Sequence, residues 1–211
     1  MGRLEDPVVS GVRSISATKS AGGLGLALSR EEFKAELWAL LEDREQREGH
    51  SFYNQFMAGE LTISQLQAYY RYLYHTCTNF VRLVSLAHAL AEHRDARLMM
   101  ATNFIDEYGD GQEGLDHPKL AMHVGVKLGL TEDEIENAPP PAGIPEQWNR
   151  IQAVASSSFL EALAVLLVIE ADLPVRHKRM REALMTHYGL EAADLEYYRQ
   201  HMEDGGVAHD D

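Results

Sequence analysis

Cysteine, basic residues and long apolar runs are all scarce in this 211-residue chain. Cysteine occurs once, at Cys77, so no disulfide can form within the chain and a reducing, cytoplasmic location is expected. The 19 Lys and Arg residues face 33 Asp and Glu residues, and a formal net charge of −14 disfavours nucleic acid or an anionic membrane as a partner. The longest apolar run, 162–169, is much shorter than the roughly 20 residues that cross a bilayer.

Sequence motifs of several enzyme classes are also missing. The chain has no P-loop, GxSxG, paired CxxC or HExxH pattern, and its one GxGxxG match, Gly109–Gly114, follows a predicted helix rather than the strand that a dinucleotide-binding site requires. Nucleotide binding, α/β-hydrolase chemistry and zinc-protease chemistry therefore lack support. Cys77 fits a small buried residue better than a catalytic thiol, because nothing around it in the sequence would activate a thiol.

Helical periodicity dominates what is present, and no segment alternates with a period of two. We therefore expect an all-α protein, a single bundle of about seven to eight helices over 29–211 that follows a flexible tail, 1–28. Ser29 and Glu32 form a capping-box pattern at the start of the first helix, which Gly49 ends. The remaining helices are predicted near Phe52–Phe56, after a cap at Thr62 or Ser64 to about residue 92, and over 94–108, 116–129, 131–134, 147–172, 174–188 and 191–204.

Glu170 is an acid at the end of one of the most apolar stretches of the chain, 159–169. An unpaired carboxylate in such surroundings costs several kcal/mol of desolvation, so Glu170 is expected to be neutral, paired or bound to a metal. Arg176 or Arg179 could supply a positive partner after the bend at Pro174. Glu161 falls on the opposite face of the same helix, so the two acids are not expected to meet.

Two other segments carry acids and imidazoles. Glu107 and His117 are ten residues apart, about 15 Å along a regular helix, but the intervening glycines allow the segment to fold back and bring both to one point. His201 and Asp204 share a helical face, and His209 follows. The ordinary interpretation of all of these is a solvated helix end. The other histidines have no partner at ligand spacing and are interpreted as ordinary surface or half-buried residues: His50, His75, His88, His93, His123, His177 and His187.

Four fragments, in order, resemble the haem-oxygenase-like di-iron oxidase family, which belongs to the same superfamily as the TenA thiamin-salvage proteins and the PqqC oxidases. The resemblance covers about residues 30–211. The fragments are Gly59-Glu-Leu-Thr-Ile-Ser-Gln-Leu66 in the early helices, Asn103-Phe-Ile-Asp-Glu-Tyr-Gly-Asp-Gly111 with His117-Pro-Lys-Leu120, Glu170-Ala-Asp-Leu-Pro174, and Tyr197-Tyr-Arg-Gln-His201.

The resemblance implies a helical bundle that holds Fe(II), with two ions expected and O2 as co-substrate. The family's ligand order, Glu, His, Glu, His, Asp, His, is carried over to Glu107, His117, Glu170, His201, Asp204 and His209. The family usually ends His-x3-Asp-x2-His, whereas here Gly205 and Ala208 occupy the last two ligand positions. A π-bulge or a broken turn at Gly205-Gly206 could restore that geometry.

The resemblance also implies a function: oxidation or oxygenation of a small amino-acid-, amine- or fatty-acid-like substrate in a biosynthetic pathway, with an external electron donor and a homodimeric assembly. Two alternatives stay open. One is a metal-free TenA- or PqqC-type enzyme acting on a heterocycle, and the other is a non-catalytic helical protein whose acids are salt-bridged.

Overall fold

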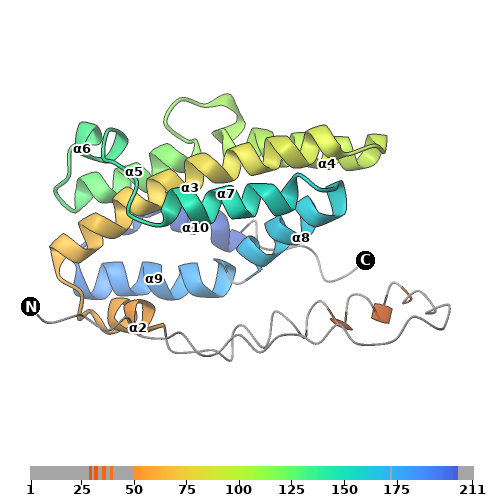
Figure 1. The fold of residues 1–211 in the computed structure, drawn as a ribbon. Coiled ribbons are helices and arrows are strands. Elements are labelled where there is room, and N and C mark those ends of the chain that lie inside the picture. The colour runs from red at the N-terminus through yellow and green to blue at the C-terminus, as the bar shows by residue number, and fades with distance from the viewer. Residues whose placement is uncertain are drawn as a thin grey trace, which may run out of the picture. The chain divides into compact units, whose positions relative to one another are not determined.

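The computed structural model describes residues 29, 31–32, 35–36, 39, 50–171 and 173–203. Every regular element in these ranges is helical, which confirms the all-α prediction (Figure 1). None of these helices is both long enough and apolar enough to cross a membrane. The helices are α2 (Ser51–Ala58), α3 (Ile63–Leu90), α4 (Arg94–Glu107), α5 (His117–Lys127), α6 (Glu132–Glu136), α7 (Ile144–Ala155), α8 (Phe159–Glu170), α9 (Leu173–His187) and α10 (Glu196–Glu203), with 3-10 turns η1 (Gly109–Gly111) and η2 (Ala192–Asp194).

The chain divides into two units, Met1–Trp38 and Ala39–Asp211. In the first unit, the Ser29–Glu32 capping box is present as predicted. The Ser29 N–H donates to Glu32 Oε2 at 2.8 Å, and the Glu32 N–H donates to Ser29 Oγ at 3.2 Å. The two side chains thus satisfy backbone donors that a helix start leaves unpaired. The elements from α2 onward all belong to the second unit.

Polar side chains at the predicted positions begin three helices of the second unit. Thr62, rather than Ser64, caps α3 and accepts a hydrogen bond from the Gln65 N–H at 3.3 Å. Asp116 caps α5 through the Lys119 N–H at 3.0 Å. Thr131 forms a capping box at the start of α6. Local sequence therefore sets where these helices begin.

Two predicted helices are wrong in their continuity. The expected helix 147–172 is divided into α7 and α8, because the hydroxyls of Ser156 and Ser157 donate back to carbonyls of α7 while Ser158 caps α8. The expected helix 191–204 begins instead as the 3-10 turn η2, in which the Asp194 carboxylate accepts from the Glu191 N–H at 3.0 Å. In both places side-chain hydrogen bonds compete with the regular helix pattern.

Helix α3 is the central element of the second unit. It packs against α4, α5, α6, α7 and α8, while α9 packs against α2 and α10, and α10 also contacts α5 (Figure 1). Phe56, Tyr70 and Tyr198 are completely buried in the main core. Complete burial of a large apolar side chain contributes roughly 1.5–3 kcal/mol, so these residues help to fix α2, α3 and α10 in place. The arrangement brings α4, α5, α9 and α10 around the same end of the core.

Candidate metal centre

A tight turn brings the end of α4 next to the start of α5. Gly109 and Gly111 have φ values of 60° and 75°, and Asp110 between them has a φ of 54°. This left-handed conformation is costly for most residues but not for glycine. It reverses the chain between Glu107, the last residue of α4, and His117, the first of α5. The two side chains therefore meet despite their ten-residue separation.

Glu107 and His117 form a buried acid–imidazole pair. Glu107 Oε2 lies 2.9 Å from His117 Nδ1, and the two residues are 7% and 8% exposed. Because removing either group from water alone would be unfavourable, each compensates the desolvation of the other. The structure thus places Glu107 and His117 in the core rather than on a solvated helix end.

His201 on α10 joins this pair. Its ring centroid lies 4.5 Å from that of His117, and its Nδ1 lies 2.7 Å from the carbonyl oxygen of Tyr197. A carbonyl oxygen can only accept, so Nδ1 carries the hydrogen and Nε2 keeps its lone pair. Burial, followed by the charge of nearby His117, lowers the pKa of His201 to about 3. His201 is therefore a neutral imidazole at physiological pH, which is the form that binds metals.

His177 on α9 is a fourth member that the sequence analysis missed. It is only 2% exposed, and its ring centroid lies 4.8 Å from that of His201. Burial, with smaller effects from His201, Arg176 and His117, lowers the pKa of His177 well below its ordinary value. A sequence signal was present, because His177 falls in register with the buried Leu173, Met180 and Leu184 of α9.

The thiol of Cys77 lies close to this cluster. Its Sγ is 3.4 Å from the Tyr197 hydroxyl, and Tyr197 packs against His201 at 4.5 Å between ring centroids. Burial raises the pKa of Cys77 to about 12, and the negative charges of Glu107 and Glu170 add to the increase. The two carboxylates therefore act electrostatically on the same point in the core.

Glu170 is less enclosed than its sequence suggested. It lies at the end of α8 and is half-buried. The helix is not buried all round, because Leu160 is 74% exposed and Val168 is 43% exposed. Glu170 therefore keeps part of its contact with water, and its desolvation is smaller than the apolar sequence around it predicted. Glu161 is exposed at the opposite end of α8, where it bonds to Ser158, and the prediction that it does not meet Glu170 is confirmed.

Asp204 and His209 lie outside the described residues. Within the described part of the chain, no three His, Cys, Asp or Glu side chains are already arranged to hold a metal ion. The donor types nevertheless fit iron, which accepts imidazole nitrogen and carboxylate oxygen. In particular, His177 Nδ1 is buried without a hydrogen-bond partner among the described residues.

Comparison with known proteins gives consistent matches. A family model described as iron-containing redox enzyme matches residues 67–205. A 4-aminobenzoate synthase of Chlamydia muridarum (strain MoPn / Nigg) is 26% identical over 179 residues, covering 84% of this chain and 74% of that protein. A 4-aminobenzoate synthase of Chlamydia trachomatis is 26% identical over 162 residues, covering 76% of this chain and 68% of that protein. The matched range of the family model contains Glu107, His117, Glu170, His177 and His201.

Proposed function

The chain belongs to the family of iron-containing redox enzymes, as its resemblance to the haem-oxygenase-like di-iron oxidases predicted, and from this premise we propose that it is an O2-activating oxidase or oxygenase of a biosynthetic pathway. The observation that supports this most directly is that the buried Glu107 and His117 meet the half-buried His201, each from a separate helix. Acids and imidazoles contributed by different helices of a bundle are a typical way of holding non-haem iron.

We propose that Glu107, His117, Glu170 and His201 hold the iron, with Asp204 and His209 completing the site. Bound iron would supply the one-electron and O2 chemistry that protein side chains cannot perform themselves. The protein's own contribution is to exclude water and fix the donors. The Tyr197 carbonyl, for example, holds His201 in the tautomer that leaves Nε2 available. We propose that two ions bind, and the iron content per chain tests this number.

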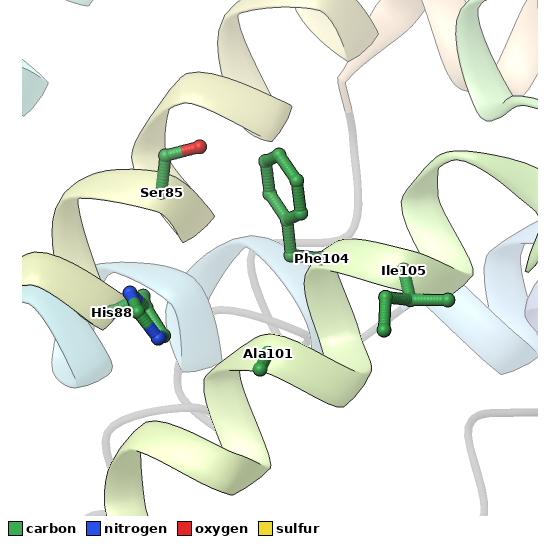
Figure 2. A pocket seen from close by; sticks show the side chains of 5 residues that line it. All are labelled: Ser85, His88, Ala101, Phe104 and Ile105. Carbon is green, nitrogen blue, oxygen red and sulfur yellow. The ribbon is translucent and has the colours of Figure 1, made fainter. Parts of the chain in front are cut away.

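A cavity between α3 and α4 offers a place for an apolar part of the substrate. It has a volume of about 300 Å³ and is lined by Ser85, His88, Ala101, Phe104 and Ile105. Figure 2 shows Ser85 and His88 on α3 facing the segment of α4 that carries Ala101 and Phe104. Phe104 lies one helical turn before Glu107, so one wall of the cavity and one proposed iron ligand belong to the same helix.

The relatives narrow the class of substrate. Their name, 4-aminobenzoate synthase, concerns formation of a small molecule with an amine and a carboxylate. We propose that this chain likewise acts on a small amino-acid-, amine- or fatty-acid-like molecule. Ser85 and His88 would provide polar groups beside an otherwise apolar cavity wall.

The test is iron binding by the full-length chain. Protein loaded anaerobically with Fe(II) and freed of loosely held metal should retain stoichiometric iron, and it should consume O2 when a reductant is added. Glu107→Gln and His117→Gln should each weaken binding by at least about tenfold, since even outer partners of a metal site contribute 10–100-fold. His123→Gln is the matched control, because His123 lies on the same helix as His117 with its side chain 45% exposed.

Trace iron in the wild-type protein, or iron retention that neither Glu107→Gln nor His117→Gln changes, would contradict the proposal. The metal-free TenA-type alternative makes a different prediction, because it relies on a catalytic cysteine. The raised pKa and the burial of Cys77 do not favour a reactive thiolate at that position.

A further inference from the structure

We propose that His177 is an additional metal ligand of this protein, supplied by α9. The inference rests on the proposed function, since it concerns the same iron site. It adds a donor that the resemblance to the family did not assign and that does not depend on the segment carrying Asp204 and His209. The ligand set of the described residues would then include three imidazoles, those of His117, His177 and His201.

His177 is a polar residue on the buried, otherwise apolar face of α9. Leu173, Met180 and Leu184 occupy the same buried stripe of the helix, and Met180 and Leu184 are completely buried. A histidine in such a stripe is normally satisfied by hydrogen bonds at its ring nitrogens. His177 Nδ1 is instead buried without a hydrogen-bond partner among the described residues. An unsatisfied buried polar atom costs about 1–3 kcal/mol of folding free energy. A metal ion bound to His177 Nδ1 would offset this cost.

The neighbouring side chains do not provide the missing partner. His177 packs against Tyr197 at 5.4 Å and Tyr198 at 5.0 Å between ring centroids. The hydroxyl of Tyr197 lies 3.4 Å from the Cys77 Sγ, and that of Tyr198 lies 2.6 Å from the Tyr70 hydroxyl. Both hydroxyls are therefore already engaged elsewhere, and these contacts hold the His177 ring in place without satisfying Nδ1.

His177 also lies next to the other candidate metal ligands. The ring of His201 is 4.8 Å from that of His177 and 4.5 Å from that of His117, so it contacts both. The three rings come from α5, α9 and α10, and Glu107 adds a carboxylate from α4. Imidazole rings packed against one another gain little from each other, whereas a shared cation would use their ring-nitrogen lone pairs.

The experiment compares His177→Leu with wild-type protein in the full-length chain. Leucine matches the apolar residues of the stripe, so the metal-free variant should unfold at the same temperature as wild type or a higher one. Its affinity for Co(II), measured by competition with a chromophoric chelator, should fall at least about tenfold, and the visible absorption bands of bound Co(II) should change. His187→Leu is the control, because His187 is an exposed histidine on the same helix.

A second measurement identifies the ligand directly. Long-range 1H–15N spectra of the Zn(II)-loaded protein should show a metal-dependent shift of one His177 ring nitrogen, assigned by its absence from the His177→Leu spectrum. Unchanged Co(II) affinity and spectrum in His177→Leu, or His177 nitrogens that ignore Zn(II) while those of His117 and His201 respond, would overturn the inference and leave the iron proposal intact. Failure of wild-type protein to bind Fe(II), Co(II) or Zn(II) would instead reject both.

Discussion

The hydroxyl oxygens of Tyr70 and Tyr198 lie 2.6 Å apart in the fully buried core, joining α3 to α10 across 128 residues of sequence. This hydrogen bond fixes the helix that carries His201. Changing Tyr70→Phe or Tyr198→Phe alone leaves the other hydroxyl buried without its partner, so each should lower the free energy of unfolding by about 1–3 kcal/mol.

The double variant Tyr70→Phe/Tyr198→Phe removes both hydroxyls and should cost less than the sum of the two single changes. Chemical denaturation of all four proteins would measure this difference. Strict additivity would show that the two hydroxyls do not depend on each other.

Gly59 and Gly189 provide a matched pair of glycine substitutions. Both have positive φ, 71° and 72°. A Cβ at Gly59 would overlap the ring of His187, whereas no atom of the described residues lies within 4 Å of a Cβ at Gly189. Gly189→Ala should therefore cost only the backbone strain, about 1–2 kcal/mol, and Gly59→Ala should cost more because α2 must also move away from α9. Equal losses in thermal unfolding would show that the contact with His187 is easily relieved.

Asp194 should make stability depend on pH. Its carboxylate accepts a hydrogen bond from Lys127 Nζ at 2.8 Å, and this bond, together with the one from the Glu191 N–H, lowers the pKa of Asp194 below its ordinary value. Because the folded-state pKa is the lower one, the stabilisation is present above the ordinary value near 3.8 and is lost as the pH falls through the folded-state pKa.

Asp194→Asn should therefore lower the melting temperature at pH 7 by roughly 1–2 °C, in line with a partly exposed ion pair. The difference from wild type should shrink below the ordinary pKa of the carboxyl group. A difference that persists unchanged into strong acid would assign the role of Asp194 to packing rather than charge.

Cys77 should be unreactive in the folded protein. Its thiol is buried and burial raises its pKa to about 12, so the thiolate that reacts with alkylating agents is nearly absent at pH 8. Iodoacetamide should label Cys77 at a rate limited by unfolding, and labelling should become rapid in denaturant. Rapid labelling under native conditions, followed by loss of activity, would favour the TenA-type alternative.

Much of this fold was readable from local sequence. Helix starts were predicted at Ser29, Thr62, Asp116 and Thr131, because the side chains of these residues satisfy backbone N–H groups only three residues away. The breaks at Ser156–Ser158 and at Asp194 were not anticipated. There the hydrogen bonds of a few side chains outweigh a helical pattern that continues through them.

The sequence predicted only part of the candidate site. The order of short motifs identified four candidate ligands, Glu107, His117, Glu170 and His201. The glycines after Glu107 explained how two residues ten positions apart could meet. His177 was overlooked because spacing along the chain compares residues within one helix, whereas His177 meets its partners on α10 and α5.

The sequence by itself determined the helical class, most helix starts and the kinds of donor available, because capping and periodicity act over a few residues. Only the tertiary structure decided which donors meet, how enclosed Glu170 is, and that His177 lies beside His201 with a nitrogen that has no hydrogen-bond partner among the described residues. Those outcomes depend on how α4, α5, α8, α9 and α10 pack around α3, and packing is a balance of contacts between residues far apart in the chain.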